Sequence, residues 1–309
     1  MTLISIVTPC YNEEENVEEL HAQIDKVMQA FPQYDYEHIY IDNASTDQTV
    51  PILRRLASQD SKIKVIVNAR NFGHIRSPFY GLIQAKGDAV IIMASDLQDP
   101  PALIPSFIRK WEEGFKVVMG IKSNSEETLP LFLFRTLYYR TLARLSDVRL
   151  VENYTGFGLY DRLVVDTLRS INDPYPYFRG LIADLGYEAA KIEFTQPTRK
   201  RGITKNNFFT LYDMAMLGLV NYSKVPLRLA TMFGFVAAAV SAFIGLFYLV
   251  YKLINWQNFE LGLAPMVVGL FFFGSVQLFF LGIVGEYIGA IHTQVLHRPL
   301  VIEKERINF

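Results

Sequence analysis

The segment Met93-Ala94-Ser95-Asp96-Leu97-Gln98-Asp99-Pro100-Pro101 decides how this chain is interpreted. It follows a short apolar run, residues 89–93, that has the length and composition of a buried strand. The Pro-Pro pair ends that strand and can open a helix. We therefore expect its acidic and amide side chains just past the carboxyl end of a central strand. In open α/β sheets, that is where ligands bind.

Two oxygen-bearing side chains in this segment form a candidate metal site. Asp96 and Gln98 are separated by one residue, so their side chains point to the same side if the chain stays extended. Carboxylate and amide oxygens suit a hard cation such as Mg²⁺ or Mn²⁺, and such a cation suits a diphosphate. Asp and Pro after a strand are also ordinary turn residues. The segment alone is compatible with either interpretation.

Composition and motif searches exclude several classes of protein. The 309 residues suffice for one large domain or two ordinary ones, and a net charge of −1 argues against a general nucleic-acid binder. Cys10 is alone, so no internal disulfide forms, and we expect it to be buried. The chain contains no G-x-G-x-x-G after its first strand, no P-loop motif, no G-x-S-x-G elbow and no zinc-type histidine spacing. The amino-terminus has no basic region before its first apolar run, which predicts a cytoplasmic start without a signal peptide.

Strands and helices alternate through the first 121 residues. The apolar patterns predict strands over residues 3–8, 36–41, 63–67, 89–93 and 116–121, with helices over 14–29, 48–58, 74–85 and 102–113 between them. This alternation predicts a mostly parallel sheet with helices on both faces. The polar clusters after four of the strands would then converge at one edge.

The next hundred residues are less regular. We expect a helix over residues 129–145, a glycine-bearing turn over 153–162, an aromatic loop over 173–180 and an edge strand over 189–194. A basic loop over 198–205 precedes a helix over 207–222, whose apolar spacing suits a helix lying on a membrane surface. Packing of that helix against the soluble domain is an equally good interpretation.

Two stretches near the carboxyl end, residues 229–251 and 261–285, contain no Asp, Glu, Lys or Arg. A helix of about 20 residues crosses a hydrocarbon core of about 30 Å, so each stretch is long enough to span a bilayer. Basic side chains flank the pair on both outer sides, whereas the connecting loop has the single cation Lys252. The positive-inside rule therefore predicts a hairpin with both ends in the cytoplasm, at the inner membrane of the cell. Two buried helices of a soluble protein would be an unusual use of apolar runs this long.

The chain resembles glycosyltransferase family 2, whose nucleotide-sugar-binding fold is called GT-A. The resemblance is closest to the polyprenyl-phosphate sugar transferases, which include dolichyl-phosphate mannose synthases and bactoprenol glucosyltransferases. The matching features lie in the family's order along nearly the whole chain: Thr8–Glu13, Asp42–Ser45, Asn71–Gly73, Asp96–Pro101, the loop Arg199–Lys205 and the paired membrane helices.

The resemblance implies a role for each matching position. Positions expected to bind the donor nucleotide sugar are Pro9, Tyr11, Glu13, Asp42, Ala94, Ser95, Asp96 and Lys122. Asp96 and Gln98 match the family's ligands for Mg²⁺ or Mn²⁺. The implied catalytic residues are Asp96, Arg199, Arg201 and Lys205, and Arg201 and Lys205 would also meet the acceptor phosphate. The need to hold two polyanions together adds Arg135 as a further candidate for that phosphate. The basic loop is also compatible with a flank that touches anionic lipid, and the two roles can coexist.

Two positions depart from the family's pattern. Ala94 stands where the family has the first acid of Asp-x-Asp, and Gly156 stands where many members carry an Asp proposed as the base. Both losses together are compatible with an inactive member. A polyprenyl phosphate acceptor, however, is mostly dianionic at pH 7, because its second pKa is about 6. Such a nucleophile needs no base, so activity can survive the loss at position 156.

These observations predict four parts: a cytoplasmic GT-A domain (1–200), a basic loop with an interfacial helix (201–228), two transmembrane helices (229–290) and a cytoplasmic tail (291–309). The expected activity is inverting, metal-dependent transfer of a hexose, glucose from UDP-glucose, to undecaprenyl phosphate. One alternative is a non-catalytic membrane partner that binds nucleotide sugar or assists a flippase. Another is a polysaccharide synthase, although its Q-x-x-R-W motif is absent. Glycine-rich and phenylalanine-rich membrane faces also permit homo-oligomers.

Overall fold

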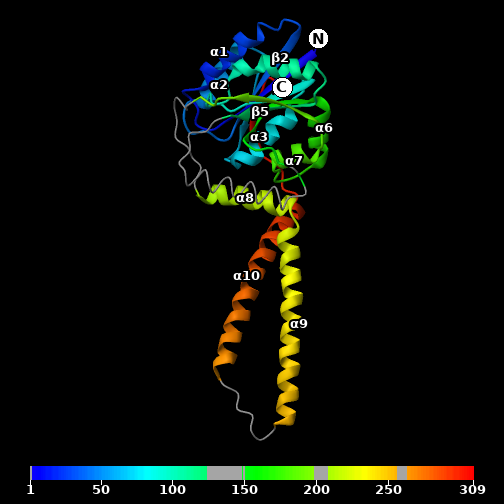
Figure 1. Ribbon diagram of the computed structural model, residues 1–309. Coiled ribbons are helices and arrows are strands. Elements are labelled where there is room, and N and C mark those ends of the chain that lie inside the picture. Colours follow the sequence, from blue (N-terminus) through cyan, green and yellow to red (C-terminus); the bar gives the residue numbers. More distant parts are fainter. Residues whose placement is uncertain (1, 124–147, 149, 198–207, 256–262) are drawn as a thin grey trace.

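The computed structural model describes residues 2–123, 148, 150–197, 208–255 and 263–309. An α/β domain stands on two long helices, and a shorter helix lies across the base of the domain (Figure 1). The predicted helix over 129–145 and the predicted basic loop over 198–205 lie outside the described residues.

The described residues form an eight-stranded sheet in the order β7-β5-β6-β4-β1-β2-β3-β8. The strands are β1 (Thr2–Cys10), β2 (Tyr34–Asp42), β3 (Ile63–Asn68), β4 (Ala89–Ile92), β5 (Val117–Lys122), β6 (Tyr154–Asp161), β7 (Ala189–Phe194) and β8 (Glu303–Ile307). The neighbours β4, β1, β2 and β3 are parallel, as the alternation predicts. The strand β7 lies at the edge, which confirms that prediction.

The turn predicted over residues 153–162 is wrong, because most of this stretch forms the strand β6. It runs antiparallel between β4 and β5 and makes the sheet mixed. The two glycines in this stretch suggested a turn, yet Gly158 is required inside the sheet. A Cβ atom at Gly158 would lie 2.2 Å from the Val118 carbonyl oxygen on β5. The aromatic loop over 173–180 is also shorter than predicted, because a helix begins at Phe178.

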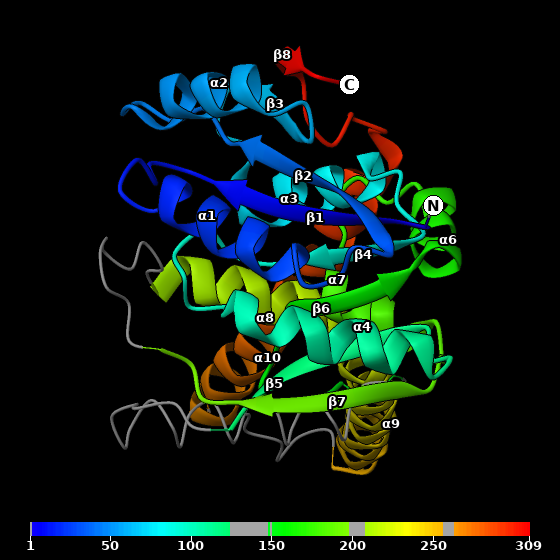
Figure 2. The same ribbon diagram turned by 90° about the horizontal axis from the view of Figure 1, so that it is seen from above.

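Helices cover both faces of the sheet (Figure 2). The helices α1 (Val17–Met28), α2 (Thr49–Gln59) and α4 (Ile104–Glu112), with the short 3-10 turn Pro101–Leu103, pack on one face. The helices α3 (Gly73–Gln84), α6 (Arg162–Ile171) and α7 (Phe178–Asp184) pack on the other. Alternate β1 side chains point into the hydrophobic cores on the two faces of the sheet: Ile4 and Ile6 pack with α1, and Val7 packs with α3. Cys10 is buried, as predicted, and burial raises the pKa of its thiol.

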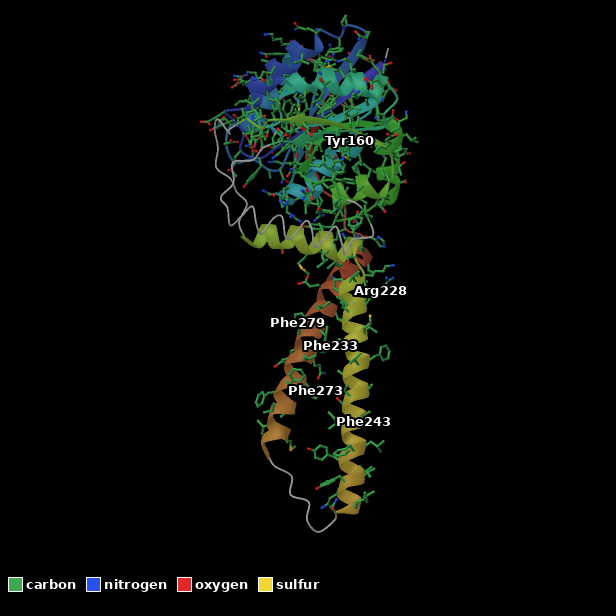
Figure 3. All side chains as sticks on the ribbon, viewed as in Figure 1. Tyr160, Arg228, Phe233, Phe243, Phe273 and Phe279 are labelled. Carbon is green, nitrogen blue, oxygen red and sulfur yellow. The ribbon has the colours of Figure 1, made fainter. Side chains whose placement is uncertain are left out.

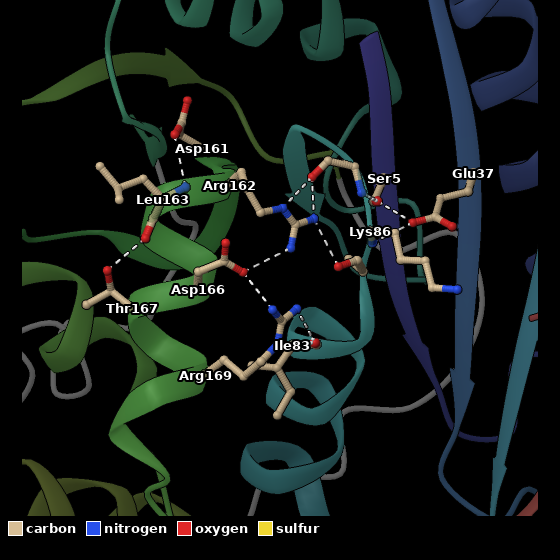
Figure 4. Close-up of polar contacts among 12 residues, drawn as sticks. Ser5, Glu37, Ile83, Lys86, Asp161, Arg162, Leu163, Asp166, Thr167 and Arg169 are labelled. Carbon is tan, nitrogen blue, oxygen red and sulfur yellow. Dashed lines mark hydrogen bonds and ion pairs between the residues drawn. The ribbon is translucent and has the colours of Figure 1, made fainter. Parts of the chain in front are cut away.

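The junction from β6 to α6 is fixed by polar contacts (Figure 4). The Asp161 side chain caps α6 by accepting the Leu163 N–H at 3.0 Å. The next residue, Arg162, donates from Nε to the Gly87 carbonyl at 2.9 Å and from Nη2 to the Ala85 carbonyl at 2.9 Å. These bonds join β6 to the turn that precedes β4, so the strand that carries the 93–101 segment is held from both sides.

Two helices, α9 (Val225–Ile254) and α10 (Leu263–Val295), extend away from the domain. Val225–Ile254 and Met266–Val295 are long and apolar enough to cross a membrane. The most apolar part of each helix is not buried against the rest of the protein. Aromatic side chains such as Phe243 and Phe279 are exposed along these helices, whereas Phe233 of α9 packs against Phe280 of α10, with ring centres 5.6 Å apart (Figure 3). Exposed apolar helices of this length associate with a membrane, because water would solvate them poorly.

The base of the domain meets the membrane helices at α8 (Phe208–Tyr222). Tyr287 of α10 donates from its hydroxyl to the Ser223 carbonyl at 2.6 Å. Gln294, near the end of α10, donates from Nε2 to the Asp173 carboxylate at 2.9 Å. Hydrogen bonds therefore hold α10 against the domain beside α8.

The carboxyl-terminal residues differ from the tail that we assigned to 291–309. The helix α10 continues to Val295, and β8 adds to the sheet antiparallel to β3. Asn308 donates from Nδ2 to the Ala57 and Ile63 carbonyls at 2.7 and 2.9 Å. The chain therefore returns from the membrane helices to close the edge of the sheet.

A buried histidine makes folding stability depend on pH. His38 is fully buried, its Nε2 lies 3.0 Å from Thr8 Oγ1, and burial lowers its pKa well below the ordinary value. The folded protein keeps His38 neutral, whereas the unfolded chain binds a proton below about pH 6.5. We expect stability to fall by about 1.4 kcal/mol per pH unit below that point. Thermal unfolding at pH 5 and pH 7.5 should show a smaller pH effect for His38→Gln. The exposed His297→Asn serves as the control, and an unchanged pH effect in His38→Gln would contradict the assignment.

Candidate active site

A cavity of about 380 Å³ lies beyond the carboxyl ends of β1 and β4. It is bounded by the 93–101 segment, by the first turns of α3, by the end of β5, by the start of β6 and by α7. Its polar lining includes Asp96, Gln98, Asp99, Lys122 and Arg179, and its apolar lining includes Phe79, Phe157, Tyr177 and Phe178. Of the four strand-end clusters that we expected to converge, the one after β4 supplies Asp96, Gln98 and Asp99, and the one after β3 supplies His74.

The 93–101 segment is folded differently from the extended chain that we considered. Leu97 has a φ of 61°, and the Gln98 N–H donates to Asp96 Oδ1 at 3.1 Å. The chain therefore turns at Leu97, which is the Asx-turn geometry that Asp favours. Asp96 and Gln98 still line the same cavity, so the turn brings together the two side chains that we expected an extended chain to align.

Asp99 holds this segment in place. Its Oδ2 accepts the Ala94 N–H at 2.9 Å, and the residue is 7% exposed. Burial and the neighbouring Asp96 raise the pKa of Asp99 to about 6, against the opposing effects of the Ala94 N–H and the Lys122 charge. Ala94, at the position of the family's first acid, thus contributes its backbone to the site.

The donor set at this end of the cavity fits a hard divalent cation. Asp96 and Gln98 offer oxygen atoms, and Asp96 is 8% exposed. No group of three or more His, Cys, Asp or Glu that could hold a metal occurs among the described residues. A cation at Asp96 and Gln98 would therefore take the rest of its ligands from a diphosphate and from water, which is the usual arrangement for Mg²⁺.

Cationic side chains line the same cavity. Lys122 ends β5, and Arg179 lies in the first turn of α7, where its guanidinium is 5.4 Å from the Tyr177 ring centre. Arg179 also donates from Nη1 to the Tyr154 carbonyl at 3.4 Å. Partial burial and the charge of Arg179 lower the pKa of His74, another lining residue. From the sequence, we did not predict that Arg179 or His74 would line the site, and we assigned no role to Asp99.

The backbone at Gly156 explains the absence of an acid there. Gly156 has a φ of +106°, in the region that favours glycine, and it lines the cavity. Its carbonyl accepts the Tyr160 hydroxyl at 2.7 Å, and Tyr160 bonds in turn to the buried Tyr154 hydroxyl. This chain therefore uses position 156 for backbone geometry, and its cavity wall is held by two buried tyrosines.

The predicted donor residues are divided between the cavity and an adjacent pair of loops. Pro9, Ala94, Asp96 and Lys122 line the cavity, whereas Tyr11, Glu13, Asp42 and Ser95 do not. The loops after β1 and β2 are bonded to each other: the Asn12 N–H donates to Ser45 Oγ at 2.9 Å. The buried Asp42 accepts the Ser45 N–H at 2.9 Å, and burial raises its pKa. Arg135, Arg199, Arg201 and Lys205 are outside the described residues.

Comparison with known proteins gives two family matches. Residues 5–169 match the model of glycosyl transferase family 2, and residues 225–291 match that of the GtrB C-terminal hairpin. An uncharacterized glycosyltransferase of Bacillus subtilis, YkcC, is 31% identical over 96% of this chain and 92% of its own. The bactoprenol glucosyl transferase of Shigella phage SfV is 32% identical over 97% of this chain and 98% of its own. The crystal structure of glucosyl-3-phosphoglycerate synthase from Mycobacterium tuberculosis superposes with a TM-score of 0.48, at 18% identity over 71% of this chain and 76% of that chain.

The fold is an α/β domain of the GT-A type, with a cavity at the carboxyl ends of its strands and two apolar helices long enough to span a membrane. The chain belongs to glycosyl transferase family 2, and it is a glycosyltransferase with the GtrB type of carboxyl-terminal hairpin. The resemblance that we found in the sequence is therefore confirmed.

The charge of Lys122 provides a direct test of the cavity. We expect Lys122→Gln to lower sugar transfer by about 10–100-fold, because a charge-assisted contact to phosphate is lost while the strand remains intact. The matched control is Lys191→Gln, which removes an exposed cation from the neighbouring strand β7. Transfer of labelled sugar to extracted lipid measures both. Equal rates for wild type and Lys122→Gln would remove Lys122 from the site.

Proposed function

We propose that this glycosyltransferase transfers a hexose, glucose from UDP-glucose, to a polyprenyl phosphate such as undecaprenyl phosphate. The reaction inverts the anomeric carbon and takes place at the cytoplasmic face of the membrane. One observation carries the proposal: a single cavity combines oxygen ligands, Asp96 and Gln98, with the cations Lys122 and Arg179, in a domain mounted on two apolar helices. The relative from Shigella phage SfV is named bactoprenol glucosyl transferase and aligns with this chain over nearly its full length, which supports the choice of acceptor.

The chemistry requires two polyanions to be brought together. The acceptor phosphate is mostly ionised at pH 7, so it attacks the anomeric carbon without a base, and Gly156 can replace an acid. Lys122 and Arg179 offset the repulsion between the acceptor phosphate and the donor diphosphate. A divalent cation on Asp96 and Gln98, Mg²⁺ or Mn²⁺, would supply charge to the departing diphosphate when bound.

The position of the cavity suits an acceptor that stays in the bilayer. Tyr177, at the start of the helix α7 that carries Arg179, packs against Tyr222 of α8, and their ring centres are 5.9 Å apart. The helix α8 lies across the base of the domain, where α9 and α10 begin to extend away (Figure 1). A lipid phosphate at the membrane surface would therefore be close to α7, and both chain termini would lie on the cytoplasmic side.

The second candidate function is a non-catalytic membrane partner that binds nucleotide sugar. Ala94 and Gly156 favour it, since both lack acids that family members use. A labelled-sugar assay distinguishes the two functions. Membranes containing the full chain are offered a panel of labelled nucleotide sugars with polyprenyl phosphate and Mg²⁺, and the lipid is extracted. Proposed transfer gives labelled lipid from UDP-glucose. Binding of UDP-glucose by calorimetry without any labelled lipid would support the partner function.

A chelator and product analysis test the remaining details. Addition of EDTA should stop labelling, and added Mg²⁺ or Mn²⁺ should restore it, because the protein offers two oxygen ligands and the diphosphate must supply others. The anomeric configuration of the lipid-linked sugar, compared with that of the donor, reports inversion. Full labelling in EDTA would rule out metal dependence without affecting the identification of the acceptor.

A further inference from the structure

Three arginines gather outside the cavity, between α3 and the chain that follows α10. The guanidinium carbons of Arg70 and Arg76 lie 4.0 and 5.3 Å from the centre of the same Phe72 ring. Arg76 also donates from Nη2 to the Pro299 carbonyl. Burial, followed by the charges of Arg70 and Arg298, lowers the pKa of Arg76. We call Arg70, Arg76 and Arg298 the arginine cluster.

Among the residues that the structure describes, no carboxylate pairs with the cluster, in contrast to five other arginines. Arg54, Arg55, Arg162, Arg169 and Arg306 each pair with Asp or Glu. Within the described residues, the cluster donates to the Asn71 and Pro299 carbonyls. Arg76 Nε is enclosed and has no hydrogen-bond partner in that part of the chain. Three cations held together without a carboxylate favour an added anion, because a buried donor without a partner destabilises the site.

The cluster lies at the level where the domain meets the membrane helices. Arg298 is three residues beyond the end of α10 at Val295. Burial and the charge of Asp213 on α8, the helix across the base of the domain (Figure 1), raise the pKa of Tyr175, and the charge of Arg76 opposes that shift. Arg70 and Arg298 are exposed, so an anion can reach them. Phospholipid phosphates occupy this height, at the surface of the bilayer.

We propose that the arginine cluster binds the phosphate of an anionic bilayer phospholipid, at a site separate from the cavity. Guanidinium groups offer paired N–H donors that match phosphate oxygens, and stacking on Phe72 orients two of them. None of the three arginines lines the cavity, to which α3 contributes His74, Ile75, Pro78 and Phe79. The bound lipid would join α3 to the segment that links α10 to β8.

The test uses the full chain in nanodiscs. Native mass spectrometry counts the phospholipid retained after transfer from discs of phosphatidylcholine mixed with phosphatidylglycerol. We expect wild type to retain phosphatidylglycerol about tenfold more than phosphatidylcholine, and Arg76→Gln to abolish most of that preference, since a tenfold change needs about 1.4 kcal/mol. The control is Arg228→Gln, which removes the same charge at the top of α9 (Figure 3).

Each outcome decides the proposal. Equal loss in Arg228→Gln and Arg76→Gln would overturn it, because general attraction of basic residues to an anionic surface would then suffice. Unchanged retention in Arg76→Gln would overturn it as well. Displacement of the retained lipid by millimolar inorganic phosphate would assign the site to free phosphate instead. If Arg76→Gln unfolds in detergent, the exposed Arg70→Gln and Arg298→Gln replace it, and retention equal to wild type in both contradicts the site.

Discussion

Replacing Asp96 with Asn is expected to reduce sugar transfer by about 10²–10³-fold at saturating donor and Mg²⁺. Asp96 is 8% exposed and lines the cavity beside Gln98 and Asp99. The Asn side chain keeps the oxygen that accepts the Gln98 N–H, so the turn at Leu97 should persist. What is lost is the negative charge that a divalent cation requires, and with it the stabilisation of the departing diphosphate.

A matched variant separates this effect from a general loss of charge. Asp35→Asn removes an exposed carboxylate at the amino end of β2, where its partner is Lys62 at 3.9 Å. Its transfer rate should remain within about twofold of wild type. The rates come from labelled lipid, and calorimetry of UDP-glucose binding with and without Mg²⁺ reports donor affinity. Asp96→Asn with wild-type transfer and Mg²⁺-dependent donor binding would refute the role of Asp96.

Replacing Gly158 with Ala is expected to destabilise the domain by about 3 kcal/mol or more. The added Cβ would lie 2.2 Å from the Val118 carbonyl oxygen, an atom of the neighbouring strand. The sheet pairs β6 with both β4 and β5, so the backbone cannot move aside without disturbing two ladders. The strand begins next to the cavity, and transfer should fall together with the folded fraction.

The control for this variant is Gly114→Ala. Gly114 has a φ of +103° and no atom within 4 Å of its added Cβ, so backbone strain alone should cost about 1–2 kcal/mol. Thermal unfolding followed by intrinsic fluorescence, in the same detergent, compares the two proteins. If Gly158→Ala unfolds at the same temperature as Gly114→Ala or at a higher one, the close approach of β5 and β6 is not the reason for the glycine.

The family could be recognised from the chain because its features are local. The segment Asp96–Pro101 carries the family's motif, the apolar runs at 229–251 and 261–285 exceed the thickness of a hydrocarbon core, and the alternating strands and helices place the motif at a strand end. Each of these features depends on residues close together in sequence. Asp96, Gln98 and Lys122 were named on that basis, and the cavity brings them together.

Contacts between distant segments could not be predicted in the same way. Arg179 enters the cavity because α7 packs against β6, and nothing near Arg179 in the sequence indicates a site. The strand β8 has the polar sequence Glu303-Lys304-Glu305-Arg306-Ile307, which lacks an apolar face. It forms because β3 leaves an edge with backbone groups to pair, and Arg54 holds Glu305 there.

By itself, the sequence determined the class of the domain, the motif at Asp96 and the membrane hairpin, because strand periodicity, turn chemistry and apolar length are written in consecutive residues. Only the tertiary structure decided that residues 154–161 form a central antiparallel strand, that Arg179 enters the cavity, and that the arginine cluster forms beside the chain that follows α10. The physical reason is that the β4–β6 ladder, the cavity and the arginine cluster all join residues far apart in the chain. Their free energy comes from hydrogen bonds and packing that exist only after the sheet has closed.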